Sequence, residues 1–412
     1  MTTTKIFYGW TIVLVSSVVD FIAVGFFFYS YGAFFLPIAQ ELGGGTRLGV
    51  SVGITLVNVT SATIAPYTGN LLDSLSIRRM MMAGIVIASV GFFLLAQVRS
   101  MLQFYLVITT LIAIGTSTMG QISTAKLVTN WFVNKRGTAL GIATAGISLA
   151  GVIMPPITTW LIIQFGWRGT LETFSVITFV LLAPVVWFFV VDRPEDKGQE
   201  PDGVPRLPLD GVALKKPLSV RARWQDIMRM KLFWALSLNF GLNFCVVGAT
   251  LVLLMPLAQD MGLSKYTASA ILSAGALFGV LGKLVCGRLA DRSSLRVALQ
   301  SSIFFQALGI ALILFSHSMY PLLIGSIIFG FGMGAGIPLQ GTIVSAQFGR
   351  DDFGKAMGLM RPVMMPFQIL GGLLAGWLYD VQGNYNLVLS IFIVFCMISY
   401  GLTYKSLPKP AA

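Results

Sequence analysis

The chain has little charge, one histidine and three cysteines, and each shortage excludes a class of protein. Only 11% of its 412 residues are charged and 56% are hydrophobic, which is far outside the range of soluble globular domains. Cys245, Cys286 and Cys396 lie in apolar runs at spacings that fit neither a metal clamp nor a disulfide framework. His317 is the only histidine, and no carboxylate pair or Cys/His cluster lies within an apolar run. We therefore expect no enzymatic site, no metal and no cofactor.

Long apolar runs fill the chain instead, and twelve of them can be drawn. At about 1.5 Å per residue, each is long enough to cross a hydrocarbon core of about 30 Å. They cover approximately residues 10–36, 49–70, 80–98, 102–125, 138–163, 169–191, 232–256, 266–287, 297–316, 320–341, 355–378 and 386–404. The predicted fold class is an all-α integral membrane protein with twelve transmembrane helices in the lipid bilayer. The first run is too long for a signal peptide and lacks a cleavage site, so we expect it to be retained.

Residues 192–231 form the only long polar stretch, which is rich in proline, glycine and charge. Such a composition is typical of a linker. It predicts an N-terminal six-helix half, residues 1–191, and a C-terminal six-helix half, residues 232–412.

Three short patterns recur in the two halves at nearly one offset, between 217 and 219 residues. Pro37, Gln40, Glu41 and Gly43 recur as Pro256, Gln259, Asp260 and Gly262; Gly69, Asp73 and Arg78 recur as Gly287, Asp291 and Arg296; and residues 137–141, GTALG, recur as residues 354–358, GKAMG. The halves are therefore predicted to be parallel repeats related by an axis along the membrane normal, with the substrate path between them.

The basic residues predict the sidedness. Of the 28 Lys and Arg residues, 21 lie on the termini, the linker and the loops of one side, and four lie on the other side: Arg47, Arg99, Arg168 and Lys265. By the positive-inside rule both termini are cytoplasmic, in the cell membrane, which would be the inner membrane of a bacterium. The same rule explains the net charge of +12, so we do not expect nucleic-acid binding.

The paired turns after spans two and eight, the twelve spans and the central linker resemble the major facilitator superfamily across nearly the whole chain. A second set of residues resembles the monocarboxylate porters and the related oxalate/formate exchangers: Asn130-Trp131-Phe132, Lys135-Arg136-Gly137, Ala139-Leu140-Gly141, Gly146, Gly166-Trp167-Arg168 and Arg193-Pro194-Glu195-Asp196. In the monocarboxylate porters, a basic residue at the position of Lys283 meets the substrate carboxylate. The porters usually have arginine there and an aspartate one turn earlier, where this chain has Gly279.

Two cations inside the predicted spans, Lys283 and Arg361, are candidate substrate-binding residues. A charge at a helix centre costs roughly 2.5 to 3.5 kcal/mol on the insertion scale. The repeat offsets place these cations opposite Ala65 and Thr144. The equivalent positions of the N-terminal half are therefore uncharged, and the symmetry of the repeat does not explain the two cations. Arg361 has a planar fork that suits bidentate carboxylate binding. The alternatives are a snorkelling Lys283 and an Arg361 that stabilises the break at the proline that follows it.

Asp20 is the only acid well inside a span, and we predict that it carries a coupling proton; neutralising a cation is the alternative. Tyr31, Asn239, Asn243 and Gln121 complete the predicted substrate site. Asn239 and Asn243 share a helix face, as do Ser117, Gln121 and Thr124, and either set could line a path or bond helix to helix. For Lys126, a vestibule or snorkelling role is expected.

Six residues of the repeated turns are predicted to act in gating: Gly69, Asp73, Arg78, Gly287, Asp291 and Arg296. The two aspartates can meet the positive N-terminus of a neighbouring helix and so hold the halves together on the cytoplasmic side. In the superfamily this turn resembles a gate latch. The alternative, that the turns only determine sidedness, fits the arginines but does not explain the repeated aspartate.

Together these features predict a secondary active carrier that acts as a monomer and moves a small organic anion by alternating access. Proton-coupled symport of a monocarboxylate is the first interpretation, and electroneutral exchange of organic anions, as in the oxalate/formate exchangers, is the second. A membrane enzyme or a non-transporting sensor is the alternative from another class. The single histidine disfavours an enzyme, and a linker of this length cannot supply the soluble domain that a sensor needs.

Overall fold

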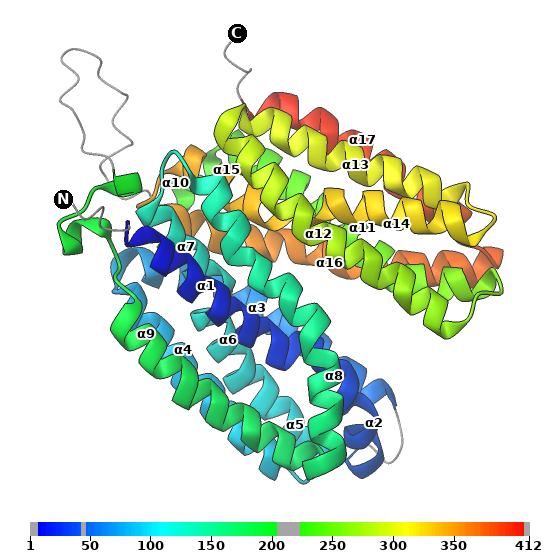
Figure 1. Ribbon diagram of the computed structural model, residues 1–412, viewed down its shortest axis with the longest axis horizontal. Coiled ribbons are helices and arrows are strands. Elements are labelled where there is room, and N and C mark those ends of the chain that lie inside the picture. Colours follow the sequence, from blue (N-terminus) through cyan, green and yellow to red (C-terminus); the bar gives the residue numbers. More distant parts are fainter. Residues whose placement is uncertain (1–6, 43–46, 204–222, 408–412) are drawn as a thin grey trace, which may run out of the picture. The chain divides into compact units, whose positions relative to one another are not determined.

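The structure is a computed structural model that describes residues 7–42, 47–203 and 223–407, and within these ranges the regular secondary structure is helical throughout (Figure 1). The middle of the predicted linker and Gly43 of the first repeated pattern lie outside the described residues. The helices up to residue 203 are α1 (Gly9–Val24), η1 (Gly25–Tyr29), α2 (Tyr31–Glu41), α3 (Arg47–Ser74), α4 (Ile77–Gln97), α5 (Met101–Val107), η2 (Ile108–Ile112), α6 (Ala113–Met119), α7 (Gln121–Trp131), α8 (Arg136–Ile177), η3 (Thr178–Leu182), α9 (Ala183–Phe189), η4 (Pro194–Lys197) and η5 (Pro201–Gly203). The later ones are α10 (Trp224–Arg229), α11 (Lys231–Asp260), α12 (Lys265–Arg292), α13 (Leu295–Leu314), α14 (Met319–Gly334), α15 (Gly336–Phe348), α16 (Phe353–Gln382) and α17 (Asn386–Ser406).

Eleven helical segments of the described residues are long and apolar enough to cross a membrane. One of them, Arg136–Phe189, has 54 residues, about 80 Å of helix and far more than one crossing needs. It is divided at Gly166, whose φ of 69° and ψ of 170° are not helical. The predicted fifth and sixth spans both lie in this segment, on either side of the glycine, which reconciles eleven segments with twelve predicted spans.

The chain divides into two compact units. The first contains residues 1–134, 142–221 and 348–361, and the second contains residues 135–141, 222–347 and 362–412. The beginning of α8 therefore belongs to the second unit, and the beginning of α16 belongs to the first. The boundaries predicted from the polar linker remain a prediction.

An aromatic cluster fills the core of the first unit. The rings of Phe26 in η1 and Phe174 in α8 stack with centroids 4.1 Å apart, and Phe92 of α4 meets Phe174 edge-on at 6.0 Å. Beside them, Ser89 of α4 and Ser175 of α8 each donate a hydrogen bond to the backbone carbonyl of the other, at 2.6 and 2.8 Å. Polar bonds and ring contacts thus join helices that have no hydrophobic drive to associate inside a bilayer.

Close glycine contacts join α12 and α14 in the second unit (Figure 1). Gly330 and Gly334 of α14 lie against Gly275 and Gly279 of α12, and a Cβ on either α14 glycine would meet a carbonyl oxygen of α12. Small residues at such crossings let two backbones approach closely. The glycine series at residues 330–336 is therefore a helix-packing surface.

Serine caps begin several helices at equivalent places in the repeats. The Ser76 side chain accepts a hydrogen bond from the backbone N–H of Arg79 at the start of α4, and Ser294 accepts one from Val297 at the start of α13. Each serine satisfies a backbone N–H that has no partner within its own helix. Because these caps lie within the repeated turns, between the aspartate and the arginine, they fix where the next helix begins.

Candidate functional site

The fourth span is broken at Gly120. This glycine, with φ −87° and ψ −145°, separates α6 from α7. Its carbonyl accepts hydrogen bonds from the backbone N–H groups of Ser123 and Thr124, at 2.9 and 3.1 Å. Helix α7 therefore begins afresh inside the span, and its first turn presents Gln121 and Thr124 three residues apart, on one face.

Asp20 lies in α1 and is fully buried. The Thr124 hydroxyl donates a hydrogen bond of 2.9 Å to Oδ1 of Asp20. The one acid predicted inside a span is thus held by the first turn of α7, in a site shielded from bulk water.

Arg361 lies in α16, and its guanidinium Nη2 donates a hydrogen bond to the side-chain oxygen of Gln121. Two residues predicted for the substrate site are therefore in contact. The Gln121 amide is a neutral acceptor, whereas a carboxylate would make a stronger, charge-assisted bond to the same guanidinium. One turn of α7 thus holds Arg361 through Gln121 and Asp20 through Thr124. We refer to these four residues as the α7 cluster.

Lys283 lies in α12, in the second unit, and only 4% of its surface is exposed. In this structure it does not snorkel into bulk water. Its backbone also takes part in a close crossing, because a Cβ on Gly141 would meet the Lys283 carbonyl oxygen.

The other three predicted substrate residues bond neighbouring helices or segments. The Tyr31 hydroxyl donates to the backbone carbonyl of Val50 at 2.5 Å. The Asn239 side chain donates to the carbonyl of Ser399 in α17 at 2.6 Å, and Asn243 donates to the side-chain oxygen of Gln306 in α13 at 3.3 Å. These contacts correspond to the helix-packing alternative for the two asparagines.

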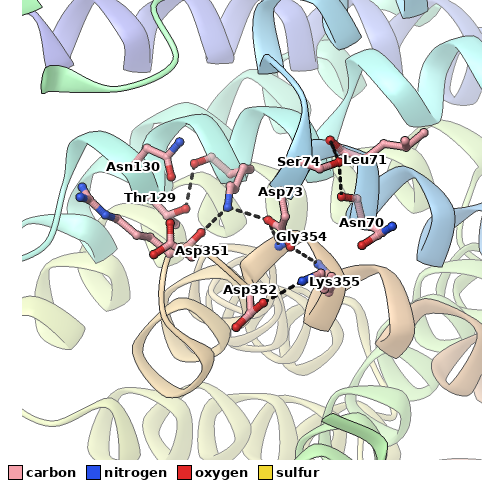
Figure 2. Close-up of polar contacts among 12 residues, drawn as sticks. Asn70, Leu71, Asp73, Ser74, Thr129, Asn130, Asp351, Asp352, Gly354 and Lys355 are labelled. Atoms are coloured by element: carbon pink, nitrogen blue, oxygen red, sulfur yellow. Dashed lines mark hydrogen bonds and ion pairs between the residues drawn. The ribbon is translucent and has the colours of Figure 1, made fainter. Parts of the chain in front are cut away.

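Asp73 caps the beginning of α16. Its two carboxylate oxygens accept hydrogen bonds from the backbone N–H groups of Gly354, at 3.0 Å, and Lys355, at 2.8 Å (Figure 2). Lys126 of α7 forms an ion pair of 2.6 Å with Asp73 and also donates to the backbone carbonyl of Arg350. We call Asp73, Lys126, Arg350, Gly354 and Lys355 the Asp73 cluster.

The beginning of the linker contacts the same turn. Glu195 forms an ion pair of 2.7 Å with Arg350, and Arg193 approaches Asp351 at 3.6 Å. Burial alone would raise the pKa of the Glu195 carboxyl, but backbone and Arg350 hydrogen bonds outweigh it and lower that pKa below its ordinary value. The pair with Arg350 is therefore intact at neutral pH and is lost only as the pH falls through the lowered pKa.

Asp291 makes the equivalent contacts in the second unit. Its oxygens accept hydrogen bonds from the backbone N–H groups of Gly137, at 2.6 Å, and Thr138, at 2.7 Å, at the beginning of α8. The two helices approach through Gly287, where a Cβ would meet the Gly137 carbonyl oxygen. Gly69 has the same relation to Gly354 in the first unit. Each aspartate thus meets the positive end of a helix dipole.

The repeated arginines bind the ends of the last helices of each repeat. Arg78 donates to the Val190 carbonyl at 2.6 Å, and its backbone N–H donates to the Asp192 side chain at 2.9 Å. Arg296 donates to the carbonyls of Tyr404, at 3.3 Å, and Leu407. A cation at a helix C-terminus stabilises the unpaired carbonyls there, so these arginines have a structural contact besides any effect on sidedness.

The described residues contain no group of three His, Cys, Asp or Glu side chains that could hold a metal ion. A family model described as the Major Facilitator Superfamily matches residues 21–305 and 249–412, which together span most of the chain. The chain belongs to the major facilitator superfamily. It is accordingly a multi-pass membrane transporter and not an enzyme, and the predicted all-α fold of twelve spans in two repeats is confirmed.

Curated relatives within the superfamily include monocarboxylate transporters. Monocarboxylate transporter 13 of Rattus norvegicus is 24% identical over 403 residues, which cover 96% of this chain and 88% of that protein. Monocarboxylate transporter 11 of Homo sapiens is 25% identical over 413 residues, which cover 98% and 83%. Among solved structures, the human organic anion transporter MFSD10 matches with a TM-score of 0.70 at 16% identity, covering 96% of this chain and 99% of that one. At that identity the structural match shows the fold alone.

Three contacts of this superfamily member were not predicted from the sequence: Lys126 with Asp73, Thr124 with Asp20, and Arg350 with Glu195. The Lys126–Asp73 pair could have been suspected from the sequence. Lys126 lies inside a predicted span, and a buried lysine is costly unless an acid pairs with it. Neither Thr124 nor Arg350 carries such a signal, because a hydroxyl and a loop arginine are common in any membrane protein.

Proposed function

We propose that this transporter carries a small monocarboxylate together with a proton by alternating access. The α7 cluster is the observation that carries the proposal, because it holds an arginine and an acid on one turn of a broken helix. Arginine is suited to a carboxylate, and a buried acid inside a span is a candidate proton carrier. The names of the curated relatives agree with a monocarboxylate substrate.

In this proposal the substrate carboxylate takes the place of the Gln121 amide oxygen on Arg361. The exchange is favourable because a charged acceptor replaces a neutral one. Lys283 supplies the second cation, and Tyr31, Asn239 and Asn243 position the helices around the path. Asp20 takes up and releases the proton, and the Thr124 hydroxyl donates to it when it is ionised.

Alternating access uses the repeated turns. The six-helix halves, residues 1–191 and 232–412, would rock about the site and be joined by the linker of residues 192–231. Asp73 and Asp291, with Gly69, Gly287, Arg78 and Arg296, would close the cytoplasmic side, the side on which both termini lie. The carrier would act as a monomer in the cell membrane.

Electroneutral exchange of organic anions is the second candidate. Lys283 and Arg361 are two cations against the single acid Asp20, so the site can balance an anion without a proton. The α7 cluster supports anion exchange if Asp20 serves only to neutralise a cation and carries no proton.

Uptake of labelled monocarboxylates into proteoliposomes with an inward proton gradient and no internal anion separates the two. Symport predicts accumulation by the wild type, whereas an exchanger accumulates nothing. In the symport case Asp20→Asn should abolish this accumulation but keep exchange of labelled for unlabelled substrate, because exchange does not require the empty carrier to reorient. Undiminished accumulation by Asp20→Asn would rule out Asp20 as the coupling residue.

A further inference from the structure

Lys126 has a role in the structure that neither the substrate site nor the repeat requires. Its side chain is buried, with only 3% of the residue exposed. The ammonium group meets two different partners, the Asp73 carboxylate at 2.6 Å and the Arg350 carbonyl. Burying a lysine is costly unless its charge is paired and hydrogen-bonded, and both conditions are met here.

The two partners of Lys126 connect it to both sides of one turn. Helix α15 ends at Phe348 and α16 begins at Phe353, so the Arg350 carbonyl follows the C-terminal end of α15. The N–H groups that Asp73 binds belong to the first turn of α16. A helix carries partial negative charge at its C-terminus and partial positive charge at its N-terminus. The Lys126 ammonium therefore meets the carbonyl that follows α15, and the Asp73 carboxylate meets the first N–H groups of α16, which is the favourable orientation for both helices.

The second repeat lacks this lysine. The offset of 217 residues that relates Gly137 to Gly354 takes Lys126 to Ile343, a fully buried apolar residue. Asp291 still binds the two N–H groups at the beginning of α8. The two repeated contacts thus share the carboxylate-to-helix bonds and differ in the lysine.

We propose that Lys126 is a positioning residue that makes the two repeated aspartate-to-helix contacts unequal in stability. In this proposal the Asp73 cluster opens less readily than the Asp291 contact. Lys126 compensates the buried Asp73 carboxylate, holds it against α16 and binds the Arg350 carbonyl that follows α15. Without Lys126, closure would bury Asp73 without a cation, and the closed arrangement would lose population. This inference rests on the gating role given to Asp73 under the proposed function.

The repeat offers a matched pair of reporter sites. Ala356 and Ala139 are each the third residue of the repeated pattern, next to the N–H groups that the aspartates bind, and both are fully buried. A cysteine at Ala356 reports opening of the Asp73 cluster, and a cysteine at Ala139 reports opening of the Asp291 contact. The full-length protein, with its three buried cysteines replaced by alanine, would be reconstituted in lipid without substrate or pH gradient and alkylated with a maleimide.

With Lys126 in place, a cysteine introduced at Ala356 should react more slowly than one introduced at Ala139. Lys126→Ile, which introduces the residue of the second repeat, should speed alkylation at Ala356 roughly 3- to 30-fold, the range expected for losing charge–dipole contacts at two helix ends. The rate at Ala139 should stay the same. Equal acceleration at both sites would indicate general loosening and overturn the proposal, as would an unchanged rate at Ala356.

A charge swap distinguishes two explanations: interaction of the charges with the two helix ends, and the ion pair between residues 73 and 126 alone. Asp73→Lys combined with Lys126→Asp keeps the mutual attraction but points a cation at the N–H groups of α16 and an anion at the Arg350 carbonyl. Alkylation at Ala356 should therefore remain fast, and recovery of the wild-type rate would overturn the proposed role. If Lys126→Ile does not fold, Lys126→Gln makes the same comparison.

Lys355→Gln is the charge-matched control. It removes a buried lysine from the same turn, one that pairs with Asp352 at 3.0 Å, and it leaves the Lys355 backbone N–H on Asp73 in place. The rate at Ala356 should not change; an increase equal to that of Lys126→Ile would mean that any positive charge near the turn suffices. Because no substrate is present, the alkylation result is independent of whether the carrier transports a monocarboxylate.

Discussion

At the scale of single residues, the α7 cluster contains the chemistry that the proposed function needs. Arg361 donates to Gln121, and Thr124 donates to Asp20, so one helical turn connects the candidate anion and proton sites. An arginine side chain keeps its charge under physiological conditions, whereas a carboxyl group can gain or lose a proton. The division of roles between Arg361 and Asp20 follows from this difference.

Arg361→Gln should weaken substrate binding by roughly 10- to 150-fold, the loss expected for one charge-assisted hydrogen bond. Arg361→Lys should recover part of this loss, because it restores the charge without the planar fork. Binding measured by counterflow of labelled acids, with thermal unfolding as a check on folding, tests both variants. Wild-type affinity of Arg361→Gln for every transported acid would assign Arg361 a structural role.

At the scale of helices, glycines of the repeated turns let pairs of helices approach closely. Gly69 of α3 meets Gly354 of α16, and Gly287 of α12 meets Gly137 of α8, each at a point where a Cβ would strike a carbonyl oxygen. The aspartate four residues after Gly69 or Gly287 can reach the N–H groups of the partner helix only because the backbones are this close. The glycine and the aspartate of the repeated turn therefore act together.

Gly69→Ala should open the Asp73 cluster, because the added methyl group must push α3 from α16 at a cost of about 1 to 3 kcal/mol. Alkylation of a cysteine at Ala356 measures the opening. Gly372→Ala in α16 is the control, since a Cβ there has no neighbouring heavy atom within 4 Å. Equal alkylation in the two variants would show that the approach of α3 to α16 does not depend on the glycine.

Gly287→Ala makes the equivalent change in the second unit. By the same reasoning it should speed alkylation of a cysteine at Ala139 and leave Ala356 unaffected. A change confined to Ala356 would contradict the assignment of Gly287 to the contact with α8.

At the scale of the whole molecule, the distribution of basic residues and the even number of spans predict that both termini lie in the cytoplasm. A single-cysteine tag at either terminus should therefore resist an impermeant maleimide in intact cells and react after permeabilisation. A cysteine at Arg99, on the side with few basic residues, should react in intact cells. The reverse pattern would invert the proposed orientation and place the Asp73 cluster and the Asp291 contact on the outer face.

The sequence by itself determined the spans, the repeat and the two aspartate turns. A bilayer imposes a minimum apolar length on every crossing and a high cost on every buried charge, so these features are recorded locally and can be counted along the chain. Asp73 and Asp291 were identified from the repeat, and in the structure each accepts hydrogen bonds from N–H groups at a helix N-terminus.

Only the tertiary structure decided which polar groups meet. Lys126 and Asp73 are 53 residues apart, Thr124 and Asp20 are 104 apart, and Arg361 and Gln121 are 240 apart. The same holds for Asn239, which bonds a backbone carbonyl 160 residues away in α17. Such pairs depend on how helices rotate and cross when small residues pack and buried polar groups find partners, and no periodicity within one helix records the side chain that a neighbouring helix will present.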